Sequence, residues 1–389
     1  MKRFLITSHL VFVLVGIATT MLGPILPLLA THWHLSDSKV GLFFVAQFLG
    51  GFVGSIASTE LVRRFSLHAT IRAGLLVIAA GVALVNTPVL PLSLAAFAIY
   101  GIGIGFCSPT ITAAVGEAVP ERRGSLLNLL NFVWTVGAIS APGLLSVALS
   151  APSIGVSGAL MILAIAMVVS AFVFPRIAAT APQTQEYRPL PVGALRLIVI
   201  TGFLIFLYVG IENGVSGWLP TFSGRVHGFD AKQSAMLQAT FWTALLTGRL
   251  GATGVLQLIS EKRLLIISMI GALAATVGLL SGRSTGALYI SVVILGLGLA
   301  PIFPTAIAVL SNSLGGQSGT KLGYMFAAAG LGGAVLPPLI GTLSSRSESL
   351  RTGMTILVLA ETALLVCHFI MSHFAAHLET RRKALQAGV

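Results

Sequence analysis

The chain has 389 residues, of which 56% are hydrophobic and only 9% are charged, and its mean hydropathy is +0.96. So few charges exclude an ordinary soluble domain, and apolar stretches of about 20 residues, the length that crosses a bilayer, recur along the whole chain. The net charge of +12 does not indicate nucleic-acid binding, because the basic residues cluster in short loops and are not interleaved with aromatic residues.

The apolar stretches predict an all-α membrane protein with twelve transmembrane helices. The first stretch follows Lys2 and Arg3, as the core of a signal peptide would. It is long and eleven others follow it, so we expect an uncleaved helix. The expected spans are residues 5–30, 38–62, 70–88, 91–118, 124–149, 155–175, 193–220, 232–256, 263–281, 286–312, 320–344 and 351–375.

The loops between these stretches indicate orientation and organisation. If the N-terminus is inside, 17 of the 23 lysines and arginines fall on the cytoplasmic side, with Arg249 counted among them. This bias predicts that both termini lie in the cytoplasm. The longest polar stretch contains Pro182 and Pro189. It predicts a cytoplasmic linker at 176–191 between a six-helix bundle at 1–175 and a second, pseudo-symmetric one at 192–389.

A shift of 195 residues relates the two predicted bundles. It places Gly101, Gly103, Pro109, Thr110, Gly124, Gly137 and Pro142 on Gly296, Gly298, Pro304, Thr305, Gly319, Gly332 and Pro337. Parallel six-helix repeats are typical of transporters that bind substrate near mid-membrane between the halves. The same glycines and prolines also suit close helix packing and kinks, and the two interpretations are compatible.

Amides and indoles inside the predicted helices are the candidate substrate contacts. Amides exchange hydrogen bonds with hydroxyl groups, and flat rings pack against the apolar faces of a sugar. An amide at these depths is equally compatible with an interhelical hydrogen bond. The candidates are Asn131, Trp134, Asn213, Gln238 and Trp242.

Glu212 lies deep within the seventh predicted helix. An ionisable side chain at membrane depth usually faces a bundle interior or a water-filled cavity and marks a pathway. We expect Glu212 to bind substrate and to be the candidate site for a coupling ion, because a carboxyl group can bond a hydroxyl, take up a proton or hold a sodium ion. The alternative is a glutamate that only pairs with a neighbouring helix.

The sequence contains no pattern typical of a catalytic or metal centre. There are no paired carboxylates and no Gly-rich phosphate loop. Cys107 and Cys367 both lie in predicted helices and indicate neither a disulfide nor a metal site. We therefore expect no enzyme, no cofactor and no metal, and a monomer in the lipid bilayer that binds a small molecule.

Three stretches resemble the fucose permease branch of the major facilitator superfamily. They are Tyr208 to Glu212 followed by Gly217-Trp218-Leu-Pro220; Phe241-Trp242 followed by Gly248-Arg249; and Gly296 to Thr305 with Gly332-Gly333 and Pro337 downstream. The resemblance implies the fold of that superfamily and transport of a hexose or related polyol across the bacterial inner membrane. Members of this branch often move the sugar together with a proton or a sodium ion, so the resemblance implies such co-transport as well.

The chain departs from this branch in its first half. Gly23 and Ile104 stand where fucose permeases carry acids, so Glu212 is the main remaining carboxyl group for coupling. Asn131 stands where the family places a polar sugar contact, and Trp134 where another amide is expected. Two alternatives stay open: an uncoupled sugar facilitator, and a drug-efflux transporter of the same fold, to whose Gly-Pro motif the sequence from Gly137 is faintly similar.

Overall fold

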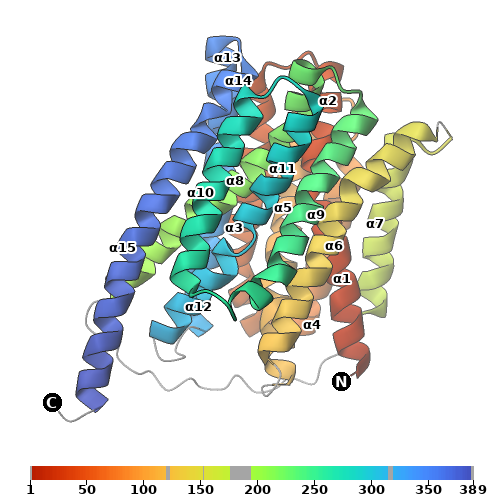
Figure 1. Cartoon of the computed structure of the whole chain (residues 1–389). Coiled ribbons are helices and arrows are strands. Elements are labelled where there is room, and N and C mark those ends of the chain that lie inside the picture. Colours follow the sequence, from red (N-terminus) through yellow and green to blue (C-terminus); the bar gives the residue numbers. More distant parts are fainter. Residues whose placement is uncertain (1, 120–122, 152, 176–193, 314–318, 387–389) are drawn as a thin grey trace.

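The structure is a computed structural model, which describes residues 2–119, 123–151, 153–175, 194–313 and 319–386. Every regular element in this part of the chain is a helix, and the helices form one bundle (Figure 1). The predicted linker lies outside the described residues. The helices are α1 (Lys2–Thr20), α2 (Leu22–His32), α3 (Asp37–Arg64), α4 (Leu67–Leu84), α5 (Leu90–Ala118), α6 (Arg123–Ser150), α7 (Gly155–Val173), α8 (Ala194–His227), α9 (Ala231–Val255), α10 (Glu261–Ser281), α11 (Thr285–Leu299), α12 (Ile302–Ser313), α13 (Gly319–Ser347), α14 (Leu350–Gly353) and α15 (Thr355–Gln386).

These helices confirm the predicted all-α membrane fold. Eleven helical stretches of the described residues are long and apolar enough to cross a membrane. The more polar α9 is 25 residues long and packs among them, against α6, α8 and α11. Two spans are broken by proline, because it lacks an N–H and its ring clashes with the carbonyl four residues earlier. Pro24 follows the break between α1 and α2, and Pro304 the break between α11 and α12.

The 195-residue repeat corresponds to matched helix crossings. Gly101 of α5 packs against the backbone of α3, and its counterpart Gly296 of α11 packs against the backbone of α9. Likewise, Gly137 of α6 packs against α1, and Gly332 of α13 packs against α8. A Cβ atom at any of the four would collide with a carbonyl oxygen of the other helix, so glycine is needed for this approach.

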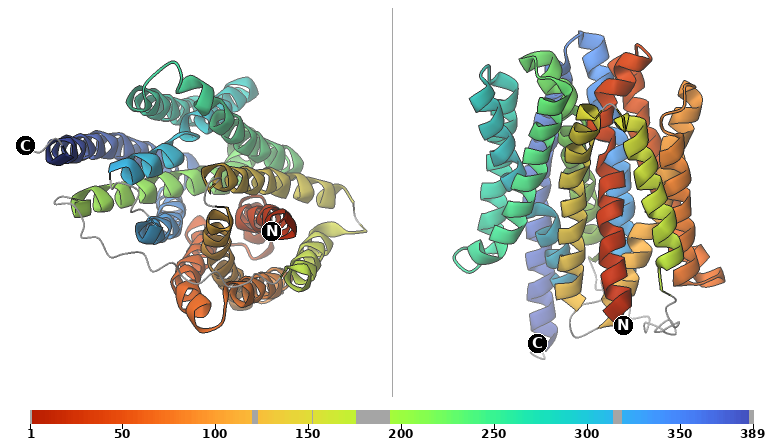
Figure 2. Two further views of the ribbon diagram at one scale, coloured as in Figure 1. Left: turned by 90° about the horizontal axis from the view of Figure 1, so that it is seen from below. Right: turned by 90° about the vertical axis from the view of Figure 1, so that its right-hand side faces the viewer.

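The helices up to α7 pack mainly on one another, and so do those from α8 onward. The two sets meet where α3 packs against α13, α6 against α9, and α2 against α8. Figure 2 shows the two sets in the view from below, with the second set drawn in green and blue. The two predicted bundles, residues 1–175 and 192–389, would meet along these three pairs of helices.

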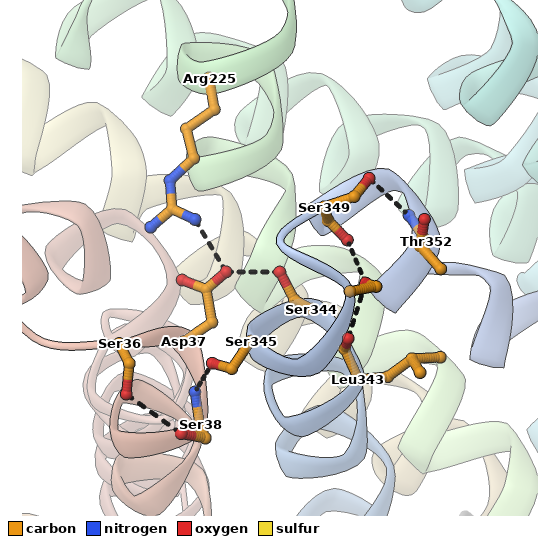
Figure 3. A network of polar contacts seen from close by, with 10 residues as sticks. Ser36, Asp37, Ser38, Arg225, Leu343, Ser344, Ser345, Ser349 and Thr352 are labelled. Carbon is orange, nitrogen blue, oxygen red and sulfur yellow. Dashed lines mark hydrogen bonds and ion pairs between the residues drawn. The ribbon is translucent and has the colours of Figure 1, made fainter.

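The start of α1 and the end of α15 lie at one end of the bundle, here called the near end (Figure 1). At the far end, Asp37 begins α3 and is buried. Its Oδ2 accepts hydrogen bonds from Arg225 Nη1 of α8 at 2.8 Å and from Ser344 Oγ of α13 at 2.5 Å. Beside it, the N–H of Ser38 donates to Ser345 Oγ at 2.8 Å (Figure 3). This network holds the two sets of helices together at the far end.

Candidate functional site

Glu212 of α8 lies at the centre of a polar cluster inside the bundle. Its side chain is only 8% exposed. The hydroxyl of Tyr208, one helical turn earlier, donates a hydrogen bond to Glu212 Oε1 at 2.7 Å. Nη2 of Arg249 on α9 lies 3.3 Å from the same oxygen and forms an ion pair with it. Glu212 therefore pairs with a neighbouring helix, as one of the two sequence interpretations expected.

Arg249 extends this cluster to a third helix. Its Nη1 donates to Thr135 Oγ1 of α6 at 3.1 Å, and its Nη2 also donates to the Tyr208 hydroxyl at 3.3 Å. The sequence analysis counted Arg249 among the cytoplasmic charges. In the structure the residue lies inside α9, six residues before the end of the helix, with its side chain 20% exposed and paired with Glu212. A guanidinium at this depth is tolerated when it is paired and hydrogen-bonded. The sequence signal for this ion pair was an acid and an arginine inside two successive predicted helices, residues 193–220 and 232–256.

Two of the predicted residues meet between α6 and α9. The indoles of Trp134 and Trp242 pack edge to face, with 5.7 Å between their ring centroids. Trp242 is fully buried, whereas Trp134 is partly exposed. The Nε1 of Trp242 is buried and has no hydrogen-bond partner among the described residues. A buried donor without a partner is uncommon in proteins and calls for an explanation.

Gln238 lies one helical turn before Trp242 on α9 and is also fully buried. Its Nε2 donates to the carbonyl oxygen of Ser216 on α8 at 2.8 Å, and its Oε1 has no partner within the part of the chain that is described. Gly23 of α2 packs against this amide: a Cβ atom there would lie 2.7 Å from Ser216 O and even closer to Gln238 Nε2. Gly23 stands where fucose permeases carry an acid. In this conformation the Gln238 amide leaves no room for a side chain at that position.

The remaining two candidates are placed differently. Asn213 donates its Nδ2 to the carbonyl oxygen of Val209 on its own helix at 2.8 Å, so this part of its amide is used locally. Asn131 is exposed and lies one turn before Thr135, whose hydroxyl donates to the Asn131 carbonyl at 2.9 Å. That turn places Asn131 on the side of α6 that carries Thr135 and Trp134. The substrate contacts of all six candidates stay predictions.

Two further observations concern metal sites and other pockets. Among the described residues, no three His, Cys, Asp or Glu side chains lie together as a metal site would require. A separate pocket between α1, α2, α6 and α7 lies away from the cluster and is lined by apolar residues such as Ile17, Ala141 and Leu160. That pocket offers no hydrogen-bonding side chain to a polar ligand.

Comparison with known proteins places this geometry in a family. A sequence model of the Major Facilitator Superfamily matches residues 9–337. The glucose/galactose transporter of Brucella abortus (biovar 1, strain 9-941) is 26% identical over 367 residues, which cover 88% of either chain. The E. coli fucose:proton symporter FucP in its outward conformation is 20% identical, with a TM-score of 0.67 over 95% of this chain and 98% of FucP. The E. coli xylose transporter XylE, partially occluded and inward open, is 15% identical, with a TM-score of 0.76 over 96% and 97%.

Proposed function

Because the chain belongs to the Major Facilitator Superfamily, we propose that it carries a hexose or a related polyol across the bacterial inner membrane by alternating access. The chain is a transporter and not an enzyme. The similarity to a glucose/galactose transporter over 88% of both chains supports a sugar as the substrate. The folds that it shares with a fucose:proton symporter and a xylose transporter support the same class.

The observation that carries this proposal is the pair of unpartnered polar atoms on α9. Gln238 Oε1 is an acceptor and Trp242 Nε1 is a donor, one helical turn apart and both buried. A hydroxyl group both donates and accepts, so sugar hydroxyls that reach these atoms when the helices move apart would satisfy both. Each unsatisfied buried group costs about 1–3 kcal/mol, and a polyol that pairs them recovers this free energy. A lipophilic cation carries few hydrogen-bonding groups compared with a sugar, which favours a sugar over the substrates of an efflux pump.

Glu212 is the proposed coupling residue. Uptake of a proton would remove the negative charge that faces Arg249 at 3.3 Å and so weaken the pair. Arg249 also bonds to Thr135 on α6, so a weaker pair would change the contact between α9 and α6. Proton binding and relative movement of the two sets of helices would then be linked. A sodium ion beside Glu212 would act in the same direction, by competing with the guanidinium.

We further propose the topology of two six-helix bundles with the near end in the cytoplasm. Lys2, Arg3, Arg63, Arg64 and Arg72 lie at the near end, which supports this orientation. The far end would then face the periplasm, closed by the Asp37 network. One chain supplies both sets of helices around the cluster, so the proposed working unit is the monomer.

The test is uptake of a panel of labelled hexoses and polyols into proteoliposomes, with and without imposed pH and sodium gradients. Saturable uptake of one or a few sugars, increased by a pH gradient, supports the proposal, and dependence on a sodium gradient identifies the other ion. Uptake that ignores both gradients indicates the uncoupled facilitator. Extrusion of several lipophilic cations without sugar uptake indicates the efflux pump.

A further inference from the structure

Another buried carboxyl group lies on α15 and takes no part in the cluster around Glu212. Glu361 of α15 is 2% exposed, and its Oε1 accepts a hydrogen bond from Thr276 Oγ1 of α10 at 2.8 Å. Its Oε2 is buried and has no partner, and no described Lys, Arg or His forms an ion pair with it. Helix α15 packs against α8, α10, α12, α13 and α14, so Glu361 lies outside the contacts between α6 and α9.

The contacts of Glu361 suit a neutral acid better than a carboxylate. An ionised carboxylate accepts several hydrogen bonds or needs a counter-ion, and burying it with one hydroxyl donor is costly. A protonated acid needs fewer partners, because its O–H can donate to a hydroxyl oxygen such as that of Thr276. Glu212 differs in this respect, since Tyr208 and Arg249 both bond to it.

A second titratable group follows on the same side of α15. His368 is seven residues further along, about two helical turns or ~10 Å closer to the near end. It is 1% exposed, its Nδ1 is buried without a partner, and its Nε2 lies 3.4 Å from Ser372 Oγ. Lys262 lies at the start of α10, which packs against α15. An imidazole with an open nitrogen can accept a proton and pass it on.

Other ionisable groups lie on the helices that pack against α15. Arg196 of α8 lines a pocket with Phe374 of α15, six residues beyond His368, and Glu261 and Arg263 flank Lys262 at the start of α10. Tyr208 and Glu212 of α8 bond to Arg249, and Arg351 of α14 donates to the Leu280 carbonyl oxygen at 2.5 Å. Arg225 of α8 bonds to Asp37 at the far end. Helix α12 has no ionisable side chain at residues 302–310, and Arg346 of α13 is exposed at the far end.

We propose that Glu361 is a second proton-binding site of this transporter, on the seam between α10 and α15, with His368 on its near-end side. The site takes up a proton from water as Glu361 changes from carboxylate to carboxylic acid, and it returns the same proton on release. It does not depend on the identity of the transported solute or on the role of Glu212.

The test uses dicyclohexylcarbodiimide, an apolar reagent that adds to protonated carboxyl groups in membranes and leaves a stable acylurea. The full-length protein in proteoliposomes is treated between about pH 5 and about pH 9, a range that spans the titration of shifted carboxyl groups. Peptide mass spectrometry then locates the adducts. The wild type is compared with Glu361→Gln, which keeps the shape without an acid, and with Glu212→Gln.

We expect an adduct on Glu361 that is abundant at low pH and lost as the pH rises, unchanged in Glu212→Gln and absent in Glu361→Gln. No adduct on Glu361 at any pH, although the reagent labels another carboxyl group, would overturn the proposal. An equal amount at every pH would overturn it too, because the acid would then be permanently protonated. The wild-type pH series decides the matter even if Glu361→Gln fails to fold. Because the labelling needs no sugar, its result can be told apart from failure of the proposed transport function.

Discussion

Arg249 Nη2 lies 3.3 Å from Glu212 Oε1, an ion pair that joins α9 to α8 inside the bundle. The other terminal nitrogen of the same guanidinium bonds to Thr135 on α6, so one side chain connects helices from both sets. The attraction between buried charges roughly offsets the cost of removing them from water, whereas loss of one partner leaves the other uncompensated. The pair is therefore sensitive to any change in the charge of Glu212.

The first prediction concerns this ion pair. Arg249→Ala should destabilise the protein by about 3–5 kcal/mol at most, the cost of an unpaired buried charge, with partial exposure reducing it. Arg249→Ala combined with Glu212→Gln should be more stable than Arg249→Ala alone, because no uncompensated carboxylate remains. Thermal unfolding of the detergent-solubilised variants measures both effects. A double variant that unfolds at or below the temperature of Arg249→Ala would contradict the buried pair.

A second prediction concerns closure of the far end. Ser38 and Ser345 are joined by a 2.8 Å hydrogen bond across α3 and α13. Cysteines introduced together at both positions should form a disulfide under oxidation and stop uptake into proteoliposomes, and a reductant should restore it. The parent chain is the control, since its Cys107 and Cys367 are both buried. Full transport by the cross-linked protein would show that the far end need not open.

The third prediction concerns the crossing of α2 with α8 and α9. A Cβ atom at Gly23 meets Ser216 O at 2.7 Å and the Gln238 amide, so Gly23→Ala should overpack this conformation. The expected loss is about 1–3 kcal/mol, seen as a lower unfolding temperature. Gly143→Ala on α6 is the matched control: its Cβ would meet nothing within 4 Å, and alanine favours the helix. Equal unfolding temperatures for both variants would rule out the tight crossing.

Features that depend on spacing along the chain could be predicted from the sequence. The apolar stretches predicted the helices, and the 195-residue shift found glycines that stand at matched crossings, such as Gly137 and Gly332. The break that separates α1 from α2 was not predicted. Pro304, which follows the break between α11 and α12, was among the prolines that the sequence analysis found suited to kinks.

Features that depend on how helices rotate against one another could not be predicted. Arg249 lies six residues before the end of α9 and was grouped with the loop charges, yet its long side chain extends to Glu212. Asn213 was predicted to contact substrate as an amide inside a predicted helix, and this contact stays a prediction. Adjacent helical residues point about 100° apart, and its Nδ2 donates to the Val209 carbonyl oxygen of its own helix. Thr135 was missed because its role arises only where α6 meets α9.

A fourth prediction concerns the donor on α9. Trp242→Phe keeps a large ring and removes only the unpartnered Nε1–H, so sugar binding should weaken by about 1–3 kcal/mol, roughly 5- to 150-fold in Kd. Trp134→Phe is the control, because it leaves that donor in place. Asn131→Ala should weaken binding by a similar amount if its exposed amide bonds the sugar. Unchanged Kd in both Trp242→Phe and Asn131→Ala would remove both residues from the site.

The central claim is that Glu212 couples sugar movement to an ion. The direct measurement compares wild type and Glu212→Gln in proteoliposomes, for sugar exchange at equilibrium and for accumulation driven by an ion gradient. Glutamine keeps the shape, and its amide oxygen can still accept from Tyr208 and Arg249, so the fold should persist, at a lower stability because Arg249 loses its counter-charge. Coupling through Glu212 predicts that exchange continues and accumulation is lost, whereas loss of both would make Glu212 chiefly a sugar ligand. Binding, exchange and accumulation all at wild-type levels would contradict the claim and leave Glu212 as a helix-packing partner of Arg249.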